Sequence, residues 1–118
     1  MAETNQNNLE FHGNLDVFQE TIRAHNGLVV VKFGSTTCGP CKRLKQILPG
    51  IAKEAPEALF LSVEVDQIPE IKDFYKITSV PQVNFYKGLD SNNNPILLET
   101  IIGVKIPEIK SAVTKYVK

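Results

Sequence analysis

The feature that most constrains this chain is a pair of cysteines placed between a β-branched apolar run and an amphipathic stretch. The run at residues 28–33 reads Leu-Val-Val-Val-Lys-Phe, which is typical of a strand covered on both faces. After Cys38-Gly39-Pro40-Cys41, apolar residues recur between 44 and 51 with the period of a helix. The sequence therefore predicts a buried strand, a loop that holds the cysteines, and a helix that begins at Cys38.

Strand and helix patterns alternate along the rest of the chain. We expect strands at 9–12, 28–33, 59–66, 82–87 and 96–102, and helices from 14 to 26, 38 to 51, 68 to 76 and 107 to 117. Asn14 is the expected cap of the first helix, and Asn26-Gly27 its expected end. Pro49-Gly50 should kink or briefly break the second helix, because proline lacks an amide hydrogen and clashes with the preceding turn.

The order β-α-β-α-β-α-β-β-α predicts an α/β fold, with a mixed central sheet and helices on both faces. Strands separated by helices should run parallel, and the last two strands should form an antiparallel edge. The carboxyl ends of such strands usually carry the chemistry, and the cysteine pair lies there. We expect one domain over 9–118, preceded by a disordered polar tail over 1–8.

Charge and hydropathy narrow the classes of function. Thirteen Lys and Arg balance thirteen Asp and Glu, which argues against a broad electrostatic footprint for nucleic acid or an anionic membrane. No apolar run approaches the roughly 18 residues of a membrane-spanning helix. The polar start lacks the apolar core of a signal peptide, so the expected location is the cytoplasm. Structural disulfides are rare there, so the cysteine pair needs a chemical explanation.

The start of a helix is a favourable place for a reactive thiol. A Cys38 thiolate would face unpaired backbone amides and the positive end of the helix dipole. Cys41 lies one helical turn later, within the Cα separation that a disulfide tolerates. Pro40 lacks an amide hydrogen that the first turn can spare, and Gly39 lets a partner's backbone come close. We expect Cys38 to be exposed and activated. Cys41 should be more sheltered and able to attack the Cys38 sulfur and displace what is bound to it.

Three alternatives compete with a redox pair. The cysteines could form half of a zinc site, but zinc takes four ligands, and the only imidazoles, His12 and His25, are not spaced as a ligand pair. The cysteines could also be incidental buried thiols, or a dispensable pair on a protein-binding adaptor. The dithiol–disulfide interpretation is favoured, and it requires no metal and no cofactor. A separate reductase must then restore the dithiol, because the chain has no glycine-rich dinucleotide fingerprint.

The motif Cys38-Gly39-Pro40-Cys41-Lys42 resembles the active site of the thioredoxin family. The similarity extends from about residue 9 to 117 and includes, at the family's spacings, Val65-Asp66, Ile77-Thr78-Ser79-Val80-Pro81, Phe85-Tyr86-Lys87-Gly88 and Gly103. The resemblance implies a thioredoxin-like fold and a thiol–disulfide oxidoreductase that reduces protein disulfides. It also implies a thioredoxin reductase as partner, and we expect a monomer.

The resemblance also implies where substrates bind. In the family, the bond that corresponds to Val80–Pro81 is cis and lies beside the disulfide, and the backbone of the residue before the proline pairs with the substrate. A partner would therefore contact Val80 and Pro81. Thr37 stands where thioredoxins usually have a tryptophan that contacts partners, so it is an expected substrate-binding residue.

The chain departs from the family most clearly at Lys32. The family has a buried aspartate here, behind the second cysteine, that helps to move its proton. Its lysine companion corresponds to Ser62, and the family's helix proline is replaced by Gln46, with Pro49 three residues later. Without the aspartate, proton transfer from Cys41 would depend on water, or on Lys32 if burial removes its proton.

Lys32 and Glu64 are therefore candidate modulators of the cysteine pKa values. Strand alternation places Lys32 opposite Val31 and Phe33, under the cysteines, with Glu64 on the adjacent strand as its candidate partner. A charged Lys32 would stabilise a thiolate, favour the reduced form and make the protein more oxidising, which keeps a disulfide-forming oxidant open as an alternative. Alternatively, Lys32 extends to the surface and plays no part.

Overall fold

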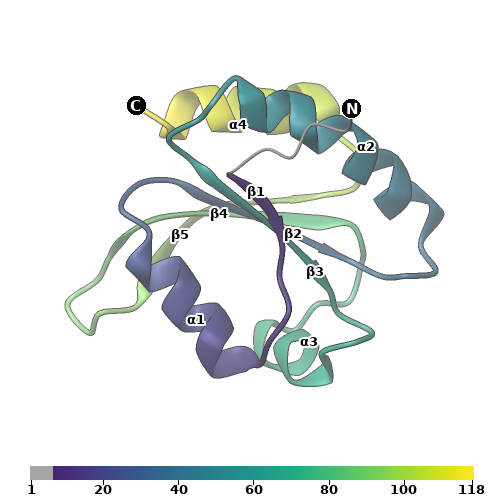
Figure 1. Cartoon of the computed structure of the whole chain (residues 1–118), viewed down its shortest axis with the longest axis horizontal. Coiled ribbons are helices and arrows are strands. Elements are labelled where there is room, and N and C mark those ends of the chain that lie inside the picture. The colour runs from purple at the N-terminus through teal and green to yellow at the C-terminus, as the bar shows by residue number, and fades with distance from the viewer. Residues whose placement is uncertain (1–6) are drawn as a thin grey trace.

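The computed structural model describes residues 7–118, which form a five-stranded mixed sheet covered by helices on both faces (Figure 1). No helix in that range is long and apolar enough to cross a membrane. The elements are β1 (Asn8–Glu10), α1 (Leu15–Ala24), β2 (Val29–Gly34), α2 (Gly39–Lys53), β3 (Leu59–Glu64), α3 (Pro69–Tyr75), β4 (Gln82–Leu89), β5 (Pro95–Ile102) and α4 (Ile106–Tyr116).

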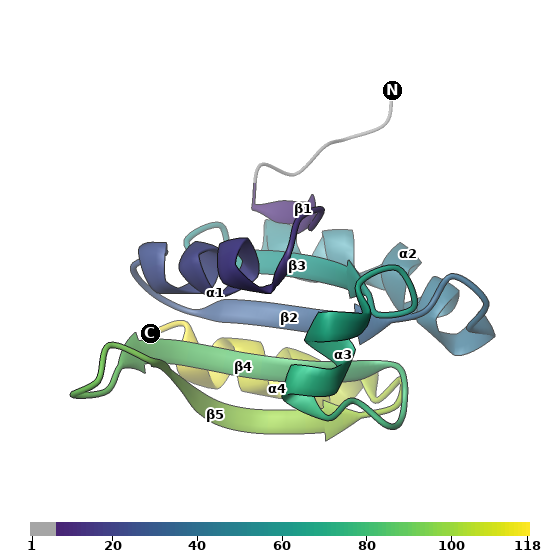
Figure 2. The same ribbon diagram turned by 90° about the horizontal axis from the view of Figure 1, so that it is seen from below.

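The strands lie in the order β1-β3-β2-β4-β5, so β1 and β5 form the two edges (Figure 2). The β1–β3 and β3–β2 pairs are parallel, and the β2–β4 and β4–β5 pairs are antiparallel. This confirms the expected mixed sheet with an antiparallel β4–β5 edge.

The direction of β4 differs from the sequence-based expectation. Strands separated by helices were expected to be parallel, yet β4 follows α3 and runs antiparallel to β2. The seven residues of α3 span only about 10 Å, whereas the six residues of β3 span roughly 20 Å. The helix is therefore too short to carry the chain back along the length of the sheet. As a result, β4 starts at the same end of the sheet at which β3 ends.

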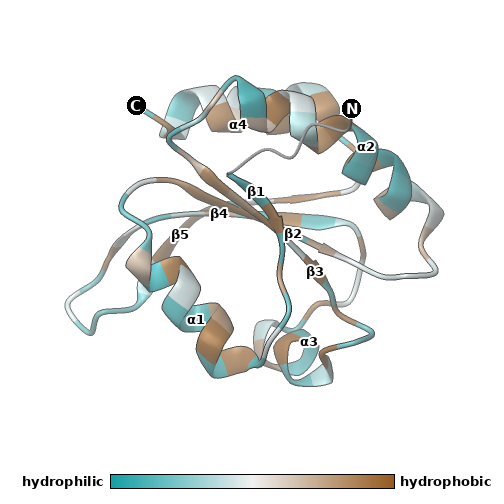
Figure 3. Ribbon diagram, in the orientation of Figure 1, coloured by the Kyte–Doolittle hydropathy of each residue, from teal (hydrophilic) through white to brown (hydrophobic). Residues whose placement is uncertain are grey.

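Each face of the sheet buries its own apolar cluster. The strands of the sheet are largely hydrophobic (Figure 3). Val29, Val31 and Phe33 of β2 pack with residues of α1 and α3. Val30 points to the other face and packs with residues of α2 and α4. Because side chains alternate along a strand, Lys32 shares the face of Val30 and lies on the α2 side, as the sequence predicted.

The folded region begins before the predicted boundary at residue 9. The side-chain amide of Asn7 donates hydrogen bonds to the carbonyl oxygens of Ala52 at 2.9 Å and Ala55 at 3.0 Å. Asn8 belongs to β1 and pairs with Phe60. These two residues are part of the structure, where the sequence predicted a tail through Asn8. The remainder of that tail, residues 1–6, lies outside the described residues.

Helix α2 is continuous across Pro49, so the brief break that the sequence allowed there is absent. The helix extends from Gly39 to Lys53 as one assigned element. Leu48 and Ile51, on either side of the proline, are both buried against the sheet. Tertiary packing on both sides of Pro49 therefore holds the helix together despite the missing amide hydrogen.

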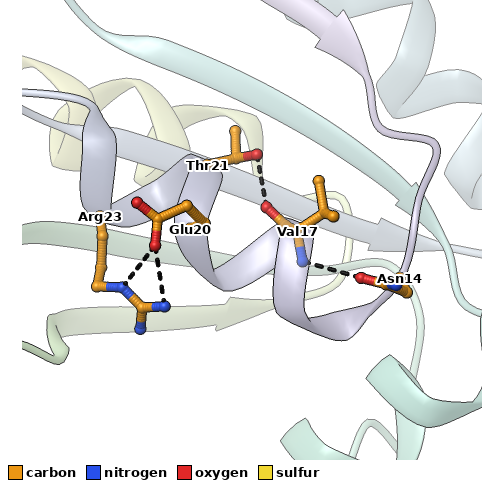
Figure 4. A network of polar contacts seen from close by, with 5 residues as sticks. All are labelled: Asn14, Val17, Glu20, Thr21 and Arg23. Atoms are coloured by element: carbon orange, nitrogen blue, oxygen red, sulfur yellow. Dashed lines mark hydrogen bonds and ion pairs between the residues drawn. The ribbon is translucent and has the colours of Figure 1, made fainter.

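Helix α1 begins at the predicted cap. The backbone amide of Val17 donates a 2.9 Å hydrogen bond to Oδ1 of Asn14 (Figure 4). One turn later, the Thr21 hydroxyl donates to the Val17 carbonyl oxygen, and Arg23 pairs with Glu20 at 3.2 Å. Phe18 and Ile22 form the buried side of the helix. The helix ends at Ala24, two residues before Asn26-Gly27.

Replacement of the Asn14 cap should destabilise the protein. We expect Asn14→Ala to lower the free energy of unfolding by about 1 kcal/mol, because the Val17 amide loses its acceptor. Urea denaturation followed by circular dichroism measures the change. Asn14→Ser keeps an acceptor oxygen and should retain most of the stability, so equal losses in the two variants would contradict the capping role.

Candidate active site

The two cysteines lie at the start of α2 and form a disulfide. Their α-carbons are 5.2 Å apart, and Cys38 is the N-cap residue of the helix. The Cys41 amide donates a 3.1 Å hydrogen bond to Cys38 Sγ. Cys38 is half-buried, whereas Cys41 is only 2% exposed. The expected difference in exposure is therefore present, with Gly39 and the first-turn Pro40 exposed between them.

Val80, which the family resemblance marks as a residue that would contact a partner, lies beside the disulfide. The Val80–Pro81 peptide bond is cis, as the family resemblance implied. Cys38 Sγ lies 3.9 Å from the carbonyl oxygen of Val80. Pro81 is buried, and its carbonyl oxygen accepts a 2.9 Å hydrogen bond from the Gly103 amide. Thr37, next to Cys38, is exposed.

An interaction that the sequence analysis missed anchors the loop before Cys38. The Thr36 amide donates a 3.2 Å hydrogen bond to Asp66 Oδ1, and the Thr36 hydroxyl donates to Oδ2. These hydrogen bonds, the one from the hydroxyl above all, lower the pKa of the Asp66 carboxyl. The order of the strands could have indicated this contact. Because β2 and β3 are parallel neighbours, the residues that follow them meet at the carboxyl ends of the two strands.

Gly34, at the end of β2, was also missed. A β-carbon at this position would lie 3.3 Å from Cys41 Cβ, 3.4 Å from Cys41 Sγ and 3.3 Å from Glu64 Oε1. A glycine that ends a β-branched strand often marks a close approach of other groups, and here it lets α2 lie directly against the sheet. The buried sulfur and the Glu64 carboxylate thus border the same small space.

Lys32 is buried near this space, with 2% of its surface exposed. Burial lowers the pKa of Lys32, and the negative charge of Glu64 partly opposes that effect. Within residues 7–118, no ion pair as short as 4.0 Å joins the two side chains, so the expected partners interact only at longer range. Glu10 instead pairs with Lys45 at 2.7 Å, and the hydrogen bond from Lys45 lowers the pKa of Glu10.

Similarity to known proteins extends over both the sequence and the backbone. The thioredoxin family model matches residues 11–100. Thioredoxin 1 of Plasmodium falciparum is 31% identical over 97 residues, which cover 82% of this chain and 88% of that protein. A thioredoxin of Ophiophagus hannah is 29% identical over 105 residues, covering 88% and 94% of the two chains. The solved structure of a Trichomonas vaginalis thioredoxin is similar with a TM-score of 0.84 at 34% identity, covering 92% and 96%.

Two glycine substitutions should have opposite effects on stability. Gly34→Ala should lower the free energy of unfolding by about 1 kcal/mol or more, because the added methyl group presses on Cys41 and Glu64. Gly50→Ala, on the open side of α2 with no atom within 4 Å, should raise it by about 0.5–1 kcal/mol through better helix propensity. Thermal unfolding of the oxidised proteins measures both. A gain of similar size in both variants would show that Gly34 is not tightly packed.

Proposed function

The chain belongs to the thioredoxin family and is a thiol–disulfide oxidoreductase, and on this basis we propose that it reduces disulfides in protein substrates through Cys38 and Cys41. The single observation that carries the proposal is the arrangement of the two sulfurs, one half-exposed at a helix N-terminus and the other buried one turn later. The adaptor alternative, with a dispensable redox pair, is not favoured by the family and fold.

In this proposal the reaction has two displacement steps. The Cys38 thiolate, facing the amides of the first helical turn, attacks a substrate disulfide and forms a mixed disulfide. Cys41 then attacks Cys38 Sγ, which releases the substrate as a dithiol and leaves the Cys38–Cys41 disulfide. The two electrons that reduce the substrate come from the two thiols. The structure holds the product of this sequence, the oxidised pair.

We propose that the substrate chain binds beside the cis proline. The Val80 carbonyl lies next to Cys38 Sγ, so an extended segment that pairs with the Val80 backbone would bring its own sulfur to Cys38. Ile102 pairs with Gln82 in the sheet and is 49% exposed, which adds apolar surface at the same edge. Exposed Thr37 would contact the substrate from the α2 side.

A thioredoxin reductase is the proposed source of electrons for the next cycle. Family membership supports this assignment, as it supports a role in cellular electron transport. We also propose a cytoplasmic location, because a pair that must return to the dithiol form requires a reducing compartment. The working unit in this proposal is the monomer, since both sulfurs and Val80 come from one chain.

The two cysteines should have separable roles. Cys38→Ser should abolish the acceleration of insulin reduction by dithiothreitol, because the attacking sulfur is gone. Cys41→Ser should also lose turnover but accumulate a mixed disulfide with the substrate, visible by mass spectrometry, because the second displacement cannot occur. Partner binding that persists with full biological effect in the double serine variant would contradict the enzymatic proposal and favour the adaptor.

We further propose that Lys32 makes the couple more oxidising. A positive charge under the cysteines stabilises a thiolate more than a neutral disulfide, so it favours the reduced form. Lys32 is buried on the face that α2 covers, two residues before Gly34, where an added β-carbon would lie 3.3 Å from Cys41 Cβ. Support therefore comes from its burial and its placement on the same face of β2.

Removal of the Lys32 charge should lower the reduction potential. We expect Lys32→Met to shift it by on the order of 30 mV toward a more reducing value, as follows from one pKa unit of lost thiolate stabilisation. Equilibration with glutathione redox buffers measures the potential. Lys53→Met removes an exposed charge at the far end of α2 and serves as the control. A potential that is the same in Lys32→Met and the unmodified protein would refute this role.

A further inference from the structure

The second displacement requires that a buried thiol lose its proton. Cys41 is 2% exposed, and only its thiolate is an effective nucleophile. Burial in apolar surroundings disfavours the charged form, so a nearby proton acceptor would speed the step. Resting on the proposed function, we propose that Glu64 is this acceptor and takes the Cys41 proton during release of the substrate.

The register of the sheet brings the carboxylate to the sulfur. Glu64 is the residue of β3 that pairs with Gly34 of β2, in the parallel ladder. The missing side chain of Gly34 leaves one space that is bordered by both Glu64 Oε1 and Cys41 Sγ. Both atoms lie within 3.4 Å of the point where a Gly34 β-carbon would stand, close enough for a single water molecule to bridge them in this proposal.

The Glu64 carboxylate is also free to accept a proton. Across residues 7–118, no hydrogen bond or ion pair engages its side chain. Glu64 is half-buried, so part of the residue reaches solvent, while Oε1 borders the space at Gly34 that Cys41 Sγ also borders. A proton taken from Cys41 can therefore pass to bulk water without crossing the core.

The neighbouring charged groups are less suited to the role. Glu10 of β1 is paired with Lys45 of α2 at 2.7 Å, so its carboxylate is already engaged. Lys32 of β2 carries its proton in the role proposed for it above, so it cannot accept the proton of Cys41. With Glu64 of β3, these are the titratable groups that interact around Lys32. Glu64 is the unpaired carboxylate among them.

The step balances as a proton-coupled displacement. As Cys41 Sγ forms its bond to Cys38 Sγ, its proton moves to Glu64 Oε1, directly or through the bridging water. The bond between Cys38 and the substrate sulfur breaks, and the substrate sulfur leaves with the bonding pair and takes a proton from solvent. Glu64 then returns its proton to water. No oxidant beyond the substrate disulfide is needed.

A single-turnover reaction isolates this step. The reduced protein is mixed with one equivalent of 5,5′-dithiobis(2-nitrobenzoate), which releases one thionitrobenzoate when Cys38 attacks and a second when Cys41 displaces it. At neutral pH, Glu64→Gln should slow the second release by about tenfold or more and leave the first nearly unchanged. The difference should shrink as the pH rises, because hydroxide then removes the thiol proton.

Two comparisons make the outcome decisive. Glu57→Gln, at an exposed position two residues before β3 begins, is the matched control and should leave both phases unchanged. In a Lys32→Met background, Glu64→Gln should still slow the second phase. The proposal is overturned if the second phase is insensitive to Glu64→Gln, or if its effect vanishes without Lys32, which would make Glu64 only a counter-charge. If the unmodified protein showed no first phase, that is, no thionitrobenzoate release from attack by Cys38, the proposed function itself would be refuted.

Discussion

The parallel, in-register pairing of β2 with β3 is the constraint on which the active site depends. Because of this pairing, both strands end at the same end of the sheet, where Gly34 lies opposite Glu64. The groups around Cys41 and the loop before Cys38 follow from this pairing. The loop from β2 leads to Cys38 and is held by Asp66, which follows β3, while the missing β-carbon of Gly34 lets Cys41 approach the strands. A change of register by one residue would turn Glu64 to the other face.

The two sulfurs have different surroundings. At the exposed end, the Cys41 amide points at Cys38 Sγ and stabilises negative charge there. Beneath the helix, Glu64 Oε1 and Cys41 Sγ border the same space at Gly34, and Lys32 is buried on the same face of β2 without forming a close ion pair with Glu64. Lys32 stands where the family resemblance implies an aspartate, and the Glu64 carboxylate lies on the neighbouring strand. The proposals for Lys32 and Glu64 both derive from this exchange of charge.

Much of this architecture could be predicted, because apolar periodicity and cysteine spacing are local properties. The strands, the helices, the cap at Asn14 and the mixed sheet were recognisable from the chain alone. The continuity of α2 across Pro49 could not be predicted from the sequence, because the burial of side chains on both sides of the proline outweighs its local cost to the helix. The predicted direction of β4 was wrong for a similar reason. The direction of this strand depends on the length of α3 relative to β3, and not on the alternation of helices and strands.

The sequence by itself determined that a reactive cysteine pair stands at the start of a helix, since Cys38 and Cys41 and the apolar pattern around them are adjacent in the chain. Only the tertiary structure decided what surrounds the second sulfur. Gly34 and Glu64 are separated by thirty positions in sequence and meet because two strands pair in parallel. Local patterns specify elements through nearest-neighbour sterics and burial, whereas contacts between elements depend on register and packing that no short stretch encodes.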